Sequence, residues 1–134
     1  MMTKAPDAFS NNDAMDFLDI LFGNPSWDVV RDAFASVIRF PKELEYSDGV
    51  YALVGMALIA NSRTGKPAVS ASIADLIVKL GKSPKDIVVM ARAAFPVVVE
   101  SQTGFAKQHL SSDVLTAWLA YIAELRTPLG YGDP

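Results

Sequence analysis

The sequence contains no cysteine and only one histidine, His109. It therefore cannot form a disulfide, use a thiolate nucleophile or build a zinc site from Cys and several His. Basic residues are also scarce, since 12 Lys and Arg against 15 Asp and Glu give a formal net charge of −3. A nucleic-acid-binding surface needs a basic patch that displaces counterions from phosphates, so we expect no nucleic-acid partner.

No hydrophobic run in the sequence is long enough to cross a bilayer. The most apolar stretch, Val50–Ala60, would span only about 16 Å as a helix at ~1.5 Å per residue, about half of a bilayer core. A second rich stretch, Ile87–Val99, contains Arg92 and Pro96. The first residues also lack the apolar segment of a secretory signal. We therefore expect a cytoplasmic protein that binds no membrane.

The sequence is rich in apolar residues, and they recur at helical spacing. Hydrophobic residues make up 51% of the 134 residues and charged ones 20%, a composition that excludes intrinsic disorder and suits one core. We predict an all-α fold, a single compact domain of about six helices around a buried central helix. The domain would span residues 1–134, with poorly ordered tails at 1–10 and 127–134.

Four of the predicted helices carry their apolar residues on one face, at positions three, four and seven apart. The stripes are Ala14, Phe17, Leu18 and Leu21 in the first helix, Trp27, Val30, Phe34, Val37 and Ile38 in the second, Ile73, Leu76, Ile77 and Leu80 in the fourth, and Leu115, Trp118, Leu119 and Ile122 in the last.

The third predicted helix, Val50–Ala60, is apolar on every side. A helix without a polar face is typical of the centre of a bundle. Gly55 within it costs about 1 kcal/mol relative to alanine. We expect a neighbouring helix to cross at close range there, because close packing is the usual compensation for such a glycine.

Short polar breaks predict where the helices begin. Asn24 followed by Pro25 indicates the start of the second helix, with a capping side chain and then proline in the first turn. Ser47 or Asp48 would cap the central helix. Ser111 or Ser112 would cap the last one.

Proline 96 lies within the fifth predicted helix, which begins at Ser83-Pro84. Proline has no N–H and its ring clashes with the preceding turn, so the helix should kink or break there. The alternative is a short strand over Val97–Val99, because β-branched residues favour extended chain. We prefer the kinked helix, since an isolated strand would have no partner.

Two motifs resemble catalytic or binding signatures only in part. Gly81-Lys82-Ser83 matches the end of a phosphate-binding loop, but Leu76 stands where a further glycine is needed and Pro84 removes one amide. A connection between two helices explains this segment.

The second partial signature is His109 with Asp113 four residues later. The aspartate could orient the histidine as a general base only if one helix continued across Ser111 and Ser112, where we expect a cap. We therefore interpret His109 as a surface residue and predict no catalytic residue.

Acidic residues are the remaining candidates for a metal-binding or catalytic site. Asp13, Asp16 and Asp19 recur every three residues, while Glu43, Glu45 and Asp48 crowd the loop before the central helix. Carboxylates can hold magnesium, manganese or calcium, but three such positions fan over about a third of a helix surface at ~3.6 residues per turn. A solvated acidic face is the simpler interpretation, so we expect no metal and no cofactor. The candidate polar cleft is formed by Asp13, Asp16, Glu43, Glu45 and Tyr46.

Several segments resemble a bacterial domain-of-unknown-function family, the one numbered 4259. Phe9–Leu18, with its Asn-Asp cap and an Ala-x-Asp-aromatic-Leu helix, is similar to the opening of that family. Further similar segments follow in the same order, namely Trp27–Ile38, Leu44-Glu45, Ala52–Asn61 and Trp118–Leu125. The family has no established activity, so the resemblance implies a fold rather than a function.

Two functional hypotheses follow. The first is a non-catalytic domain that acts through protein association, as a homo-oligomer (a symmetric homodimer is the simplest form) or with another protein, in a regulatory or immunity-like role. Its basis is a mean hydropathy of +0.23 in a domain too small to bury all its apolar surface. The alternative is an enzyme, dependent on a small ligand or a divalent metal, with a carboxylate-lined cleft between helices.

Overall fold

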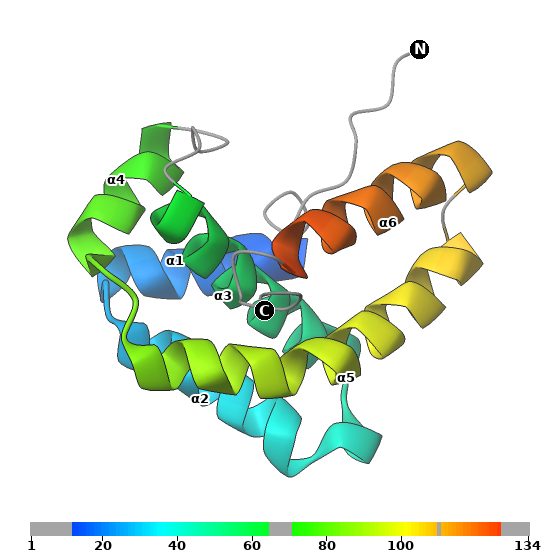
Figure 1. Ribbon diagram of the computed structural model, residues 1–134, viewed down its shortest axis with the longest axis horizontal. Coiled ribbons are helices and arrows are strands. Elements are labelled where there is room, and N and C mark those ends of the chain that lie inside the picture. Colours follow the sequence, from blue (N-terminus) through cyan, green and yellow to red (C-terminus); the bar gives the residue numbers. More distant parts are fainter. Residues whose placement is uncertain (1–11, 65–70, 110, 127–134) are drawn as a thin grey trace, which may run out of the picture.

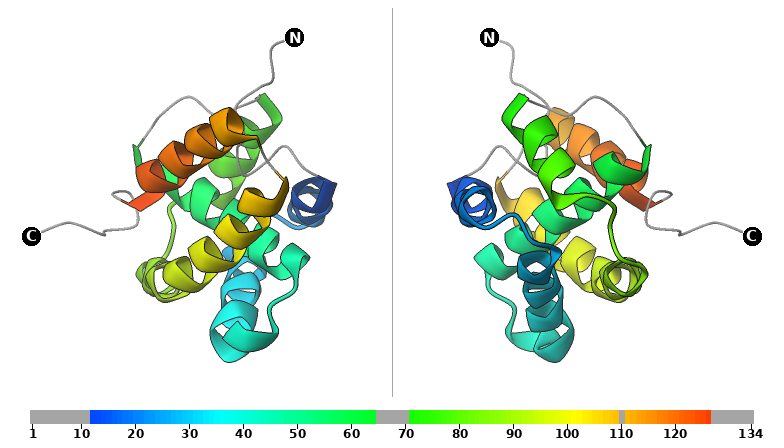
Figure 2. Two further views of the ribbon diagram at one scale, coloured as in Figure 1. Left: turned by 90° about the vertical axis from the view of Figure 1, so that its right-hand side faces the viewer. Right: turned by 90° about the vertical axis from the view of Figure 1, so that its left-hand side faces the viewer.

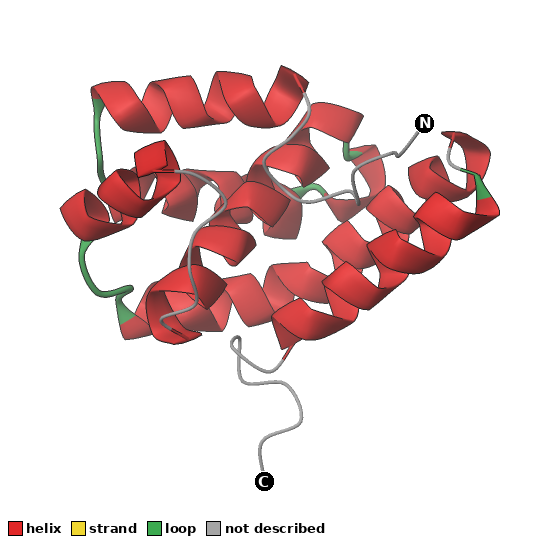
Figure 3. Ribbon diagram, turned by 90° about the horizontal axis from the view of Figure 1, so that it is seen from above, coloured by secondary structure: helices red, strands yellow, loops and turns green. Residues whose placement is uncertain are grey.

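A computed structural model of the chain describes residues 12–64, 71–109 and 111–126, and the predicted tails lie outside these residues. The described residues form six α-helices and one short 3-10 helix, without a strand among them (Figures 1 and 3). The predicted all-α fold of about six helices is therefore confirmed. The elements are α1 (Asn12–Gly23), α2 (Trp27–Arg39), η1 (Pro41–Glu43), α3 (Tyr46–Thr64), α4 (Ala71–Leu80), α5 (Lys85–His109) and α6 (Ser112–Arg126).

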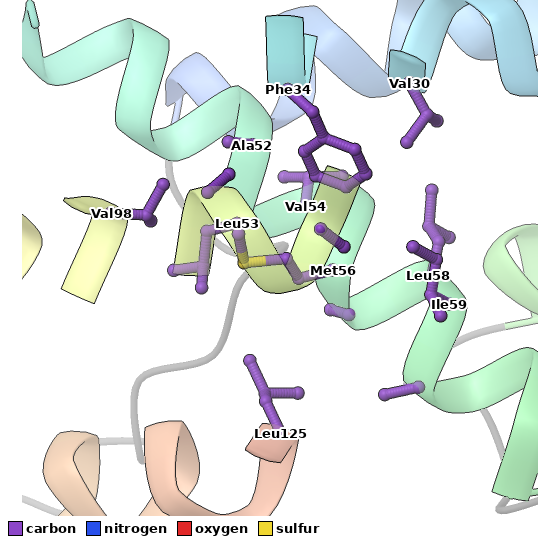
Figure 4. Close-up of a cluster of buried hydrophobic side chains, with 14 of the residues drawn as sticks. Val30, Phe34, Ala52, Leu53, Val54, Met56, Leu58, Ile59, Val98 and Leu125 are labelled. Atoms are coloured by element: carbon purple, nitrogen blue, oxygen red, sulfur yellow. The ribbon is translucent and has the colours of Figure 1, made fainter. Parts of the chain in front are cut away.

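Helix α3 is the central helix, as its all-round apolar sequence predicts. Every residue from 52 to 60 is buried. The helix contacts α1, α2 and α5 extensively and α4 and α6 less so (Figure 1). In Figure 4, Val30 and Phe34 of α2 lie over one side of α3, while Leu125 of α6 lies on the opposite side. One helix thus supplies the surface on which all the others pack.

Helix α2 approaches α3 closely at Gly55. A Cβ atom added there would lie 2.8 Å from Cγ1 of Val30 and 3.1 Å from Cζ of Phe34. Both neighbours are fully buried, so each could move only by displacing other core side chains. The prediction of a close helix crossing at this glycine is confirmed.

We expect Gly55→Ala to lower the free energy of unfolding by about 1–3 kcal/mol, because overpacking at this contact outweighs the better helix propensity of alanine. Gly104→Ala is the matched control, since Gly104 is also helical, in α5, and a Cβ there would have nothing within 4 Å. It should leave stability unchanged or raise it by up to about 1 kcal/mol. Urea denaturation followed by circular dichroism measures both, and equal effects would contradict this account of Gly55.

The start of α2 differs from the prediction. Its N-cap is Ser26, whose Oγ accepts a hydrogen bond from the Asp28 N–H at 3.1 Å, so Asn24 does not cap the helix and Pro25 precedes the cap. The sequence pattern favours Asn24-Pro25 because both residue types suit a helix start. In the structure, the backbone N–H of Asn24 instead satisfies carbonyl groups at the end of α1.

Trp27, the first residue of α2, links two distant parts of the chain. Its ring is buried, and its Nε1–H donates to the carbonyl oxygen of Gly81 at 3.3 Å. Gly81 ends α4 with a φ of +72°, a left-handed conformation that glycine adopts without strain. The turn between α4 and α5 is therefore fixed against the start of α2.

Helices α3 and α5 are both longer than the sequence pattern predicted. Helix α3 begins at Tyr46, so neither Ser47 nor Asp48 precedes it as a cap, and the helix extends to Thr64. Helix α5 runs through Pro96 and Gly104 to His109, so the alternative of a strand after Pro96 is wrong.

The last predicted cap is confirmed at Ser111, whose Oγ accepts from the Val114 N–H at 3.4 Å. Two members of the predicted stripes lie outside the core, because Ile38 is 41% and Leu119 43% exposed. Each belongs to the periodic pattern of its helix, but the neighbouring helices do not cover it. None of the helices within the described ranges has the length and hydropathy that a membrane span requires.

Candidate functional site

Four of the five candidate cleft residues lie in three elements, and Glu45 lies in the short link between η1 and α3. Asp13 lies in the first turn of α1, Glu43 ends η1 and Tyr46 begins α3. Asp16, Glu43, Glu45 and Tyr46 are exposed, Tyr46 at 38%, and Asp13 is half-buried. Of the five, the structure couples Asp13 with Tyr46 electrostatically.

The Tyr46 hydroxyl lies where the folded chain favours its protonated form. Partial burial raises the pKa of Tyr46 above its ordinary value of 10.0, and the negative charge of Asp13 raises this pKa further. At neutral pH the phenol therefore keeps its proton and can donate a hydrogen bond but cannot act as a base. Such a group can orient a ligand or a partner rather than accept a proton from it.

Backbone contacts at the start of α3 include a residue that the sequence reasoning missed. The side chain of Gln102, on α5, is 5% exposed, and its Nε2 donates to the carbonyl oxygen of Tyr46 at 3.3 Å. A Cβ at Gly49 would lie 2.5 Å from this nitrogen, so the glycine leaves room for the amide. The available signal was a polar residue four positions after Val98, on the buried face of α5.

An acidic residue in the first turn of α3 binds the loop that precedes this helix. Oδ2 of Asp48 accepts a hydrogen bond from the backbone N–H of Glu45 at 3.2 Å. This contact satisfies a backbone donor next to the helix start, which gives Asp48 a structural role.

We expect Asp13→Asn to lower the pKa of Tyr46 toward 10.0 without reaching it, because burial remains when the charge is removed. The free energy of unfolding depends on this pKa, because the folded state binds the Tyr46 proton more tightly than the unfolded chain does. The stability from this group is fully present below pH 10.0 and is lost as the pH rises through the folded pKa.

An ultraviolet titration of the phenol absorbance, with Tyr46→Phe to assign the signal, measures this effect. Asp19→Asn is the control, because it removes a carboxylate from the same helix that does not contribute to the shift. Equal pKa changes in the Asp13 and Asp19 variants would contradict the coupling.

The fold shows where the two partial signatures, His109 with Asp113 and Gly81-Lys82-Ser83, are located. His109 ends α5 and Asp113 lies in the first turn of α6, so the continuous helix that a catalytic pair required does not exist. Ser83 is buried in the connection between α4 and α5, a helix-to-helix turn.

Within residues 12–64, 71–109 and 111–126, no three acidic or histidine side chains are placed to hold a metal ion.

A different feature is prominent on the surface, namely large apolar side chains that contact solvent. Helix α1 contributes three of them, with Met15 56%, Ile20 51% and Phe22 44% exposed. The opposite side of α1 packs on α3, where the rings of Phe17 and Tyr51 stack with centroids 4.9 Å apart. The others are Ile38, Phe40, Tyr46, Val78, Val89 and Leu119.

We call Met15, Asp16, Asp19, Ile20 and Phe22 the α1 outer face. All five side chains are exposed. Met15 and Phe22, seven residues apart, lie along one edge of the helix, Ile20 lies near the other edge, and the two aspartates lie between these edges. Figure 2 shows α1 end-on at the margin of the molecule, with this helix at the periphery rather than between other helices.

Together these features define a small all-α domain with a buried central helix and an apolar and acidic outer helix. The family model described as "Domain of unknown function (DUF4259)" matches residues 5–120, and the chain belongs to this family. The suspected resemblance is thereby confirmed. No curated protein and no solved structure matches the chain.

Proposed function

We propose that the chain is a non-catalytic bacterial domain that acts in the cytoplasm by binding protein, either another copy of itself or a different protein, in a regulatory or immunity-like role. The observation that carries this proposal is the α1 outer face, where three large apolar side chains of a 12-residue helix are each more than 40% exposed. Single exposed hydrophobic residues are ordinary, whereas several on one peripheral helix are typical of interfaces.

The physical argument is that this exposure costs free energy which association would recover. Burying apolar surface is worth about 25 cal/mol per Å². Met15 and Phe22 supply flexible and aromatic surface, residue types that are enriched at protein interfaces. The central helix already buries apolar residues on every side, so the outer face of α1 is surplus to the core.

The alternative, an enzyme with a carboxylate-lined cleft, has one observation in its favour. Asp13 and Tyr46 come from separate helices and interact electrostatically. A catalytic site would need further carboxylates to converge there, but the described residues contain no group of three acidic or histidine side chains that could hold a metal ion. We therefore place this function second.

Two measurements on the purified chain separate the two functions. Sedimentation equilibrium at micromolar concentration should give a mass above 14.5 kDa. A thermal-shift screen against divalent metals and metabolites should be flat. A mass of 14.5 kDa at every concentration, together with a rise of several degrees for one ligand class, would overturn the proposal in favour of the enzyme.

A further inference from the structure

The α1 outer face has charge of only one sign. Asp16 and Asp19 lie between its apolar edges, and α1 contains no Lys or Arg. Neither aspartate takes part in an ion pair within the described part of the chain. A surface that covers this face should therefore present apolar side chains together with positive charge.

The chain itself contains a segment of this kind at the end of α2. Ile38 is 41% and Phe40 53% exposed, and both are accompanied by exposed Arg39 and Lys42. Neither cation belongs to an ion pair of the described residues. We call residues 38–42 the α2 end segment. Glu43 follows it, so residues 38–43 have two positive charges and one negative, a net charge of +1.

We propose that a second copy of this chain covers the α1 outer face, with its α2 end segment opposite Asp16 and Asp19. This inference rests on the proposed function of association and adds the partner and the contact. In a two-fold dimer each copy offers both surfaces, so the pairing occurs twice. The end-on views of Figure 2 show α1 and the turn at η1 on neighbouring sides of the molecule, an arrangement that allows this reciprocity.

The charge pattern also selects this pairing over a symmetric contact between two α1 helices. An α1–α1 contact would place Asp16 and Asp19 of one copy against the same residues of the other, and no cation of α1 could offset them. Like charges brought together at an interface cost several kcal/mol. The α2 end segment brings Arg39 and Lys42 to these carboxylates and still supplies Ile38 and Phe40 for the apolar edges.

Charge reversal on each surface tests the pairing. One variant carries Asp16→Lys and Asp19→Lys, and the other carries Arg39→Glu and Lys42→Glu. Each variant alone would place like charges in both contacts, so its dimer dissociation constant should rise by at least about tenfold relative to the unsubstituted chain. An equimolar mixture of the two variants should form a heterodimer of 29.0 kDa, twice 14.5 kDa, because both contacts are again complementary.

The control variant carries Glu100→Lys and Glu124→Lys, which gives the same change in net charge as the first variant at exposed positions of α5 and α6. It should dimerise like the unsubstituted chain. Sedimentation equilibrium measures every mass, and helical circular dichroism verifies that each variant is folded.

Three results would overturn the inference. The first is an unsubstituted chain that is monomeric up to about 0.5 mM, a concentration at which a dimer of micromolar dissociation constant would be almost fully formed. The second is a pair of reversed variants that dimerise as the unsubstituted chain does, and the third is a mixture of the two variants that stays monomeric. Dimerisation that is unaffected by the reversals would leave the proposed function of association intact and refute only this contact. Failure of the association function itself is recognised separately by the ligand-specific thermal shift described above.

Discussion

The contact of Gly55 on α3 with Val30 and Phe34 on α2 sets the distance between the two helices at the centre of the molecule. A side chain at this position would push the helices apart, and α2 would withdraw its buried face from α3. Because protein interiors are packed as densely as organic crystals, such a shift cannot be absorbed locally. The positions of α5 and of the α4–α5 turn follow from this contact, since α5 packs on both helices and Trp27 of α2 bonds to Gly81.

A core built around the apolar stretch 50–60 of α3 also determines what is left on the surface. Helix α3 is enclosed by its neighbours, so each outer helix needs only one buried face, and apolar residues beyond that face contact solvent. Met15, Ile20 and Phe22 are such residues on α1, and Ile38 and Phe40 are their counterparts at the end of α2. The two groups have charges of opposite sign beside them, which is why we regard them as halves of one interface.

At the start of α3, polar groups from two other helices interact with the central helix. Gln102 fills a position on the buried face of α5, where its amide reaches the carbonyl oxygen of Tyr46. Buried amides are tolerated only when they are hydrogen-bonded, and Gly49 leaves the room that this bond requires. Asp13 adds its charge from α1. The start of α3 is thus where α1 and α5 both meet the central helix through polar groups.

Local spacing and residue type were enough to predict several features of this protein. The helical stripes, the apolar central helix, the close approach at Gly55 and a cap at Ser111 or Ser112 all follow from periodicity and propensity, and the absence of cysteine excluded thiol chemistry. Which stripe members are covered depends instead on how the helices pack, since Ile38 and Leu119 satisfy the periodicity and are nevertheless more than 40% exposed. The Ser26 cap in place of Asn24, the continuity of α5 through Pro96, and the electrostatic coupling of Asp13 with Tyr46 also became visible only in the folded structure. The physical reason is that burial and electrostatic coupling depend on which residues distant in sequence come together, and helical periodicity contains no information about these long-range contacts.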